Sequence, residues 1–207
     1  MTDENQIQIA YRAARPDDSR DIARFMCIAG GGLYEFLFDD LIPFMTAQDF
    51  LSPSISGEHY PISYRNCRVA TAGDDDKIVG AANVFPADLL KHDNYHLLSS
   101  ERYDHIRPVL ELQDWGSMFL NSLATDETCR GFGIGAQLLG WAKTLTIESG
   151  FDRLSLHVWA DNAAAVKFYQ ARGFTTISLA ELPHHPRLSH TGGSLLMRWR
   201  APEAAHP

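Results

Sequence analysis

The pattern of hydrophobic and polar positions divides the chain into strands and helices. Ile7–Arg12 alternates apolar and polar residues as a half-buried strand does, and residues 16–29 carry apolar side chains at helical spacing. Residues 43–66 and 86–114 are mixed or polar, with a short helix near Phe50 and helical turns in the second stretch. The remaining apolar segments predict helices at 33–41, 135–148 and 163–172, and strands at 68–72, 77–85, 115–125, 153–159, 174–182 and 195–199.

These elements follow one another as β-α-α-β-β-β-α-β-α-β-β. That order predicts a mixed sheet with helices on its faces, in the α/β or α+β class. No internal repeat and no low-complexity linker interrupts it. Because 207 residues are enough to bury one large core, we expect one domain over residues 1–207.

The composition is that of a soluble globular protein, with 45% apolar residues and a net charge of -8. The acidic balance argues against nucleic acid, which needs a basic surface, and suits a cationic or amine-bearing partner. The odd number and wide spacing of Cys27, Cys67 and Cys129 are typical of a reducing compartment. No leader-like segment opens the chain, and no apolar run approaches the ~20 residues that span a bilayer. We therefore expect a cytoplasmic protein without a membrane partner.

One glycine-rich segment carries the strongest chemical signal. It lies between an apolar strand and an amphipathic helix, so its glycines leave backbone N–H groups open at a helix N-terminus. Those groups, the helix macrodipole and one arginine together favour a pyrophosphate-bearing ligand. The segment consists of Arg130, Gly131, Phe132, Gly133, Ile134, Gly135 and Ala136.

The glycine spacing alone also fits a dinucleotide, because Gly131–Ala136 satisfies the pattern GxGxx[GA]. A dinucleotide-binding fold normally opens with this unit and repeats it, whereas four predicted strands precede it here. Asp161, the one candidate for a ribose-binding acid, is better explained as a helix cap. A Walker loop is excluded, because the chain contains no GxxxxGK[ST].

Two longer motifs surround these glycines. The first is Leu123-Ala124-Thr125-x-x-x-x-Arg130-Gly131-Phe132-Gly133-Ile134-Gly135, and the second is Leu156-His157-Val158-x-x-x-Asn162-x-x-Ala165-x-x-Phe168-Tyr169-x-x-x-Gly173-Phe174. In this order and spacing they resemble motifs A and B of the GNAT N-acetyltransferase superfamily, over about residues 68–200. The resemblance implies a largely antiparallel mixed sheet with helices on both faces and a splayed central pair of parallel strands. Two positions depart from the family pattern: Glu127 and Cys129 stand where many relatives have proline and an aromatic residue or histidine.

The resemblance also implies acetyl-CoA as co-substrate, with no metal. Its pyrophosphate would rest on the glycine segment, and its pantetheine arm would pair with the main chain of the preceding strand. Asn162 would bond the arm, cap the following helix, or do both. The residues that would bind acetyl-CoA are Leu123, Ala124, Thr125, Arg130, Gly131, Phe132, Gly133, Ile134, Gly135, Ala136, Asn162, Ala165 and Tyr169.

Four residues are candidates for roles in catalysis. When an amine attacks the thioester, the departing thiolate needs a proton, and the phenol of Tyr169 is a suitable donor. Its spacing also suits a core aromatic. The acceptor amine must lose a proton, to Glu111 or Asp114 directly or through water, and Asn121 on the adjacent strand would orient that water or the acceptor. Each of these polar residues also suits a structural or solvated position.

The resemblance further implies that the acceptor is the primary amine of a small molecule or peptide. The expected function is therefore that of an N-acetyltransferase acting by direct attack in a ternary complex. An acidic, aromatic lining from Tyr34, Glu35, Phe38 and Asp39 would suit a cationic acceptor. A loop with His184, His185 and His190 would border the same pocket, without a carboxylate or thiol to complete a metal site. Two alternatives stay open: a non-catalytic acyl-CoA-binding module, and a nicotinamide-dependent reductase. Relatives often form homodimers, and we expect the same state to be accessible here.

Overall fold

The chain folds around a mixed sheet. The computed structural model describes residues 8–59, 61–92 and 97–202, and within them seven strands lie in the order β1-β2-β3-β4-β5-β7-β6. The strands are β1 (Ile9–Ala13), β2 (Cys67–Ala72), β3 (Lys77–Pro86), β4 (Met118–Thr125), β5 (Arg153–Trp159), β6 (Thr175–Ala180) and β7 (Ser194–Arg200). The helices are α1 (Ser19–Gly30), α2 (Leu33–Phe38), α3 (Ala47–Ser56), α4 (Ser100–Glu111), α5 (Ile134–Glu148) and α6 (Ala163–Gln170).

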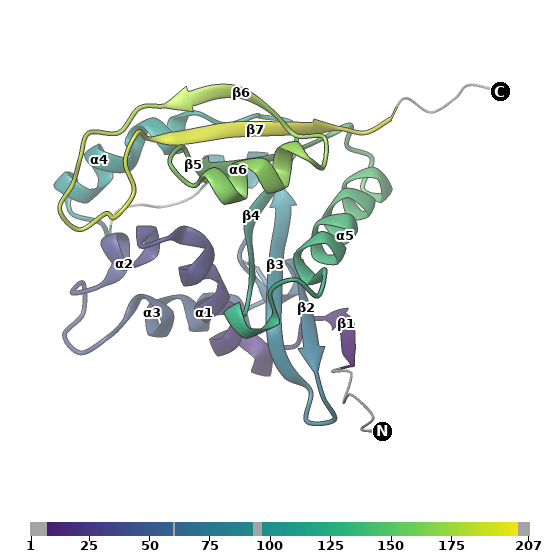
Figure 1. Cartoon of the computed structure of the whole chain (residues 1–207). Helices are drawn as coiled ribbons and strands as arrows, with labels where there is room; N and C mark the ends of the chain where they lie inside the picture. The colour runs from purple at the N-terminus through teal and green to yellow at the C-terminus, as the bar shows by residue number, and fades with distance from the viewer. Residues whose placement is uncertain (1–7, 60, 93–96, 203–207) are drawn as a thin grey trace.

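The pairing of β4 with β5 is parallel, whereas every other neighbouring pair in this sheet is antiparallel. Their ladder contains only Met118 opposite Leu154 and Phe119 opposite Ser155, after which the two strands separate. The splayed parallel pair expected from the motifs is therefore confirmed. Figure 1 shows β5, β7 and β6 at the top of the view, with β4 and β3 running below them.

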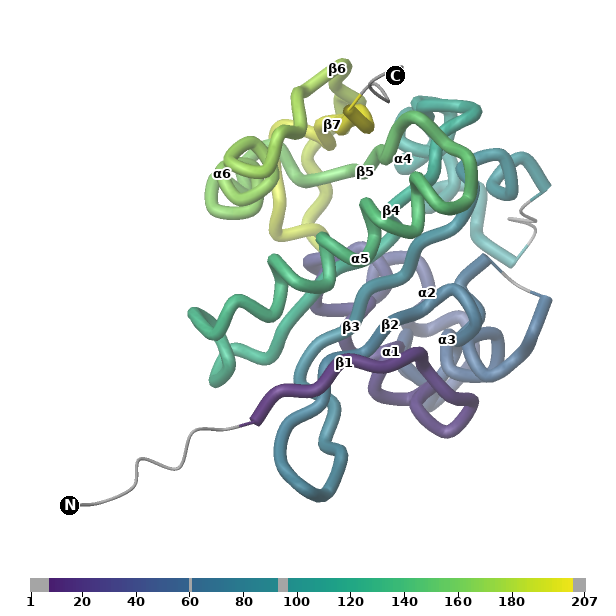
Figure 2. Tube along the Cα trace, turned by 90° about the vertical axis from the view of Figure 1, so that its right-hand side faces the viewer, coloured from purple at the N-terminus to yellow at the C-terminus, as the bar shows by residue number. Residues whose placement is uncertain are grey.

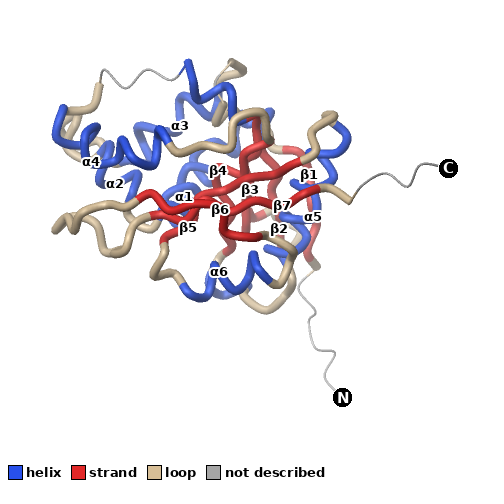
Figure 3. Tube along the Cα trace, turned by 90° about the horizontal axis from the view of Figure 1, so that it is seen from above, coloured by secondary structure: helices blue, strands red, loops and turns tan. Residues whose placement is uncertain are grey.

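Helices cover both faces of the sheet, which confirms the fold class. On one face, α5 and α6 enclose a core that includes Leu138, Leu156 and Met197. On the other, α1 packs on β3 and β4 and α3 packs on α1, around a core that includes Phe25 and Val69. Figure 2 shows α5 crossing in front of β3 and β4, and Figure 3 shows α3 and α4 on the opposite side of the strands from α6.

Most of the predicted elements are confirmed, with shifted ends. The 153–159 strand is reproduced in full, whereas the 33–41 helix ends at Phe38 because Asp39 is extended and Asp40 has a φ of 65°. The 115–125 strand begins three residues later, after a turn in which Gly116 has a φ of 77°. Of the predicted first strand, Ile7 lies outside the described residues.

Two helices lie in stretches that the sequence pattern left mixed. The first, α3, begins with a capping box in which Thr46 Oγ1 accepts from the backbone N–H of Asp49 and the Asp49 carboxylate accepts from that of Thr46. Its counterpart α4 is capped by Ser99, whose hydroxyl accepts from the backbone N–H of Arg102. Among the described residues, the helices are all too short or too polar to cross a membrane.

Candidate functional site

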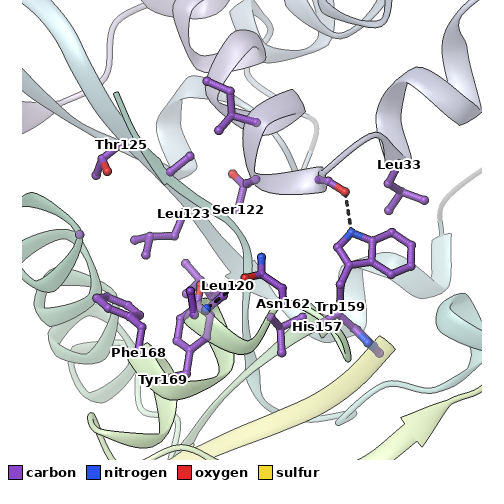
Figure 4. A pocket seen from close by; sticks show the side chains of 18 of the residues that line it. Leu33, Leu120, Ser122, Leu123, Thr125, His157, Trp159, Asn162, Phe168 and Tyr169 are labelled. Atoms are coloured by element: carbon purple, nitrogen blue, oxygen red, sulfur yellow. Dashed lines mark hydrogen bonds between the residues drawn. The ribbon is translucent and has the colours of Figure 1, made fainter. Parts of the chain in front are cut away.

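A cavity of about 600 Å³ opens where β4 and β5 separate. Its walls come from β4, the end of β5, α6, the end of α1 and the start of α5. In Figure 4, Phe168 and Tyr169 lie on one side of Asn162, with His157 and Trp159 on the other. The splay therefore creates a passage with two chemically different ends.

The glycine segment lies at one end of this passage. Gly131 and Gly133 have φ values of 89° and 77°, a conformation that favours glycine, and a Cβ at either position would meet no atom within 4 Å. Gly133 is the N-cap of α5, and no side chain caps that helix. The first N–H groups of α5, beginning at Ile134, are therefore left for an anion, and the macrodipole favours one there.

Arg130 lines the cavity beside this loop, but it already has an anionic partner. Its guanidinium lies 3.0 Å from the carboxylate of Glu127, and both side chains are exposed. Glu127 is one of the two residues that depart from the family pattern. A bound pyrophosphate would therefore compete with Glu127 for the same positive charge.

The strand β4 contributes Leu123, Ala124 and Thr125 to the cavity wall, as the motif predicts. The strand has a bulge at Asn121, two residues before this segment. Leu120 pairs with Val84 and Ser122 with Asn83, so that Asn121 has no partner in the register. The amide of Asn121 donates to the hydroxyl of Tyr34, 3.2 Å away, and lies outside the cavity lining. The bulge places the hydroxyl-bearing residue Ser122 at the cavity instead.

The helix α6 forms the wall facing β4. Asn162 caps it, because the side-chain oxygen accepts from the backbone N–H of Ala165 at 3.1 Å, which confirms the predicted capping role. Both residues also line the cavity, together with Phe168 and Tyr169. Tyr169 packs edge-on against Phe168 and Phe174, and burial raises the pKa of its phenol well above the usual value.

The opposite end of the cavity is mostly apolar. It is lined by Ile28, Leu33 and Val109, and by Trp159 at the end of β5. The indole Nε1 of Trp159 donates to the carbonyl of Gly30 at 2.8 Å, which ties β5 to the end of α1 (Figure 4). No carboxylate lines the cavity among the residues that the structure describes.

Two polar residues at this end were not proposed as site residues from sequence. His157 lies on an apolar strand and suggested only a buried core residue, and Ser194 follows a glycine-rich loop without any motif. In the structure both line the cavity, and the Ser194 hydroxyl lies 3.0 Å from Nδ1 of His157. The other ring nitrogen, Nε2, lies 2.8 Å from the carbonyl oxygen of Leu112.

Several predicted polar residues lie elsewhere. Glu111 is exposed at the end of α4, outside the cavity lining, with Arg107 at 4.0 Å. Asp114 is buried and accepts hydrogen bonds from Nε and Nη2 of Arg198, at 2.6 and 2.7 Å, so it is committed to a structural ion pair.

None of the four residues expected to form an acidic acceptor lining, Tyr34, Glu35, Phe38 and Asp39, lines the cavity. Asp39 accepts from the backbone N–H of Ala47 at 2.8 Å, and Phe38 stacks on Phe50. His190 pairs with Asp161 at 2.7 Å and stacks on Trp159, which places it behind the tryptophan that forms the wall. These side chains therefore contact other parts of the protein and do not line the cavity.

A family model described as the acetyltransferase (GNAT) family matches residues 34–174, more than half of the chain. The chain belongs to the GNAT acetyltransferase family. This membership makes the protein an acyltransferase of a family that uses acetyl-CoA as co-substrate, and it agrees with the uncapped helix terminus after the glycine loop and with the splayed strands.

Solved structures of GNAT proteins share the fold. An N-acetyltransferase from Staphylococcus aureus Mu50 is 24% identical, with a TM-score of 0.64 and coverage of 90% of this chain and 99% of its own. Mosquito arylalkylamine N-acetyltransferase like 5b is 17% identical, with a TM-score of 0.67 and coverage of 94% and 100%. A GCN5-related N-acetyltransferase from Kribbella flavida is 21% identical, with a TM-score of 0.57 and coverage of 93% and 98%.

Proposed function

We propose that this GNAT protein is an acetyl-CoA-dependent N-acetyltransferase that acetylates the primary amine of a small, apolar molecule by direct attack. The observation that carries the proposal is the passage between β4 and β5, with an anion-binding helix terminus at one end and an apolar pocket at the other. A donor thioester and an acceptor amine can meet only where the two ends join.

At the donor end, the residues present fit the pyrophosphate and pantetheine of acetyl-CoA. The open N–H groups from Ile134 onward and the charge of Arg130 would hold the pyrophosphate. The main chain of Leu123–Thr125 faces the gap left by β5 and would pair with the amides of the arm. The capping bond of Asn162 uses only its side-chain oxygen, so the side-chain NH2 group would donate a further hydrogen bond to the arm.

The chemistry requires one proton to be given and one to be removed. Attack by the neutral amine nitrogen forms the C–N bond, and the extra proton on that nitrogen passes to solvent. Collapse of the tetrahedral intermediate then breaks the C–S bond and releases a thiolate. Tyr169 is the candidate donor to that sulfur because it lines the cavity and its phenol is protonated at neutral pH. Burial raises the pKa of this phenol, so the proton moves only when negative charge has developed on the sulfur. None of the three cysteines lines the cavity, which supports direct transfer over a covalent acetyl-enzyme.

The acceptor end suits an uncharged apolar amine. An ammonium ion would lose its hydration there without a carboxylate to replace it, at a cost of several kcal/mol. Ile28, Leu33, Val109 and Trp159 would instead pack against a hydrocarbon or aromatic side chain. We therefore favour 2-phenylethylamine-like acceptors, bound as the free base, over polyamines and peptides.

Thiol release from acetyl-CoA should test this function, with 2-phenylethylamine, hexylamine, spermidine and a short peptide as acceptors. We expect turnover with the first two and little with the others. Tyr169→Phe should lower kcat about 100-fold, the usual size of a general-acid effect, and leave the KM for acetyl-CoA within about twofold. Tyr64→Phe, whose hydroxyl lies near Glu58 on the outside of the protein, is the matched control and should behave as wild type.

The outcomes separate the alternatives. Coenzyme A binding without turnover on any amine would support a non-catalytic acyl-CoA-binding module. NAD binding in place of coenzyme A binding would support the reductase. Full activity of Tyr169→Phe would remove the phenol from the reaction while leaving the transferase assignment in place.

A further inference from the structure

Ser194 and His157 form a hydrogen-bonded pair at the acceptor end of the cavity. His157 comes from β5 and Ser194 from the start of the neighbouring strand β7, and both line the cavity. The pair is 3.0 Å apart, from Nδ1 of the imidazole to the serine hydroxyl. The acetyl-transfer chemistry proposed above does not use it.

The direction of this hydrogen bond follows from the other side of the imidazole. A backbone carbonyl can only accept, so the contact of 2.8 Å between Nε2 of His157 and the Leu112 oxygen requires a proton on Nε2. This contact is much shorter than the 3.4 Å from Nε2 to the side-chain amide nitrogen of Gln113, which already donates to the carbonyl of Val109. His157 is part of the cavity wall, and the desolvation of its ring there lowers its pKa to about 4, so the ring is neutral at physiological pH. Nδ1 is then unprotonated and can only accept a hydrogen bond, so the Ser194 hydroxyl must donate to it.

Ser194 consequently presents only lone pairs to the cavity. Its single proton is held by His157, so the hydroxyl oxygen cannot donate to a substrate but can accept from one. The surrounding lining is apolar, and an N–H group entering it loses its water unless it finds such an acceptor. A neutral primary amine has N–H donors to offer while it keeps its lone pair for attack.

We propose that Ser194 accepts a hydrogen bond from the acceptor's amine and that His157 is a positioning residue that fixes the direction of the Ser194 hydroxyl. This inference rests on the proposed function and names the group that recognises the acceptor nitrogen. It explains how the cavity can hold a free amine without a carboxylate. Ser194 is thereby a specificity residue for neutral N–H donors.

Steady-state kinetics with acetyl-CoA and 2-phenylethylamine test the proposal. Ser194→Ala should raise the KM for the amine about three- to tenfold, the loss of one hydrogen bond, with the KM for acetyl-CoA unchanged. His157→Leu should raise it to the same extent, because the hydroxyl is then free to rotate. His157→Asn should keep the KM for the amine close to the wild-type value, since the asparagine oxygen can take the place of Nδ1 as the acceptor of the Ser194 proton.

Ser155→Ala is the matched control. Ser155 is a fully buried serine on β5 whose hydroxyl lies 2.8 Å from that of Ser117 and outside the cavity lining. It should lower thermal stability with no change in the KM for the amine. Ser194→Ala with an unchanged amine KM would overturn the proposal, and so would equal amine KM values for the asparagine and leucine variants of His157.

The failure of this inference can be distinguished from failure of the proposed function. If wild-type protein acetylates 2-phenylethylamine and the Ser194 variant binds it equally well, only the role of Ser194 is lost. If calorimetry shows coenzyme A binding but neither turnover nor binding of 2-phenylethylamine, the acceptor assignment and this inference both fall. If coenzyme A does not bind, the transferase assignment itself falls.

Discussion

Among single residues, Glu127 competes with a bound anion for the charge of Arg130, an effect that the motif alone does not show. Its carboxylate lies 3.0 Å from the guanidinium of Arg130, the residue expected to meet the pyrophosphate. An exposed ion pair of this kind is worth about 0.2–1 kcal/mol, and it must be broken or shared when an anion binds. Glu127 therefore weakens the donor site both by occupying Arg130 and by adding negative charge beside it.

Glu127→Gln should tighten coenzyme A binding by up to about fivefold, measured as Kd by calorimetry at low ionic strength. Glu148→Gln, at the far end of α5, removes the same charge from an exposed position and is the control for net charge. Equal tightening in both variants would show that overall charge, rather than the pair with Arg130, is responsible. Adding salt should shrink the difference between the two variants.

For individual elements, the N-terminus of α5 is the feature with the clearest function. In the loop before it, Gly131 and Gly133 have backbone conformations that only glycine adopts freely, and the helix begins without a side-chain cap. The first N–H groups of this 15-residue helix have no acceptor within the described part of the protein, and an anion bound there would accept their hydrogen bonds and stabilise the helix. The element is thus built to be completed by a ligand.

Gly133→Asp should raise the Kd for coenzyme A at least tenfold, because a carboxylate at the N-cap would take the place of the phosphate and repel it. Gly133→Asn has nearly the same shape and the same backbone strain at a φ of 77°, but no charge. It should keep most of the affinity, and both variants should unfold at similar temperatures. Equal loss of affinity in the two would assign the effect to shape or strain rather than to charge.

Over the whole molecule, contacts between distant parts of the chain close the cavity. Trp159 and Gly30, which are 129 residues apart, share a hydrogen bond that joins the first helix to the central strands. Arg198 and Asp114, 84 residues apart, join the last strand to the segment before β4. His157 lies between these contacts, bonded to the segment before β4 and to β7, so its protonation state depends on the folded state as a whole.

This burial predicts a pH dependence of stability. The pKa of His157 is about 4 in the folded protein and about 6.5 when exposed, so between these values the unfolded chain binds the proton more readily. Stability should therefore fall as the pH decreases, with His157 contributing about 2 kcal/mol of the loss between pH 7 and pH 5.

Urea unfolding of the wild type and of His157→Asn at both pH values measures that contribution, since all other titrating groups are shared. The variant should lose less stability than the wild type on going to pH 5. An equal loss in the two proteins would contradict a neutral, buried His157.

Short-range features were predictable because they depend on neighbours in sequence. The alternation of Arg153–Trp159 specified β5, and the glycines after Arg130 specified the loop before α5. Asn162 caps α6 by accepting a hydrogen bond from the backbone N–H three residues later, and an interaction this local could be predicted. The short helix α3 was only suggested near Phe50, although Thr46 and Asp49 carried its capping signal.

The acceptor end was not predictable in the same way. Polar side chains that looked catalytic, such as Glu111, lie outside the cavity, whereas His157 and Ser194 become neighbours only when β5 pairs with β7.

The sequence by itself determined the family, the glycine loop before α5 and the order of the elements, because backbone preference, capping and glycine conformation act over a few residues. The tertiary structure decided which side chains face the cavity and that its acceptor end is apolar, because strand pairing and helix packing bring together residues that are far apart along the chain.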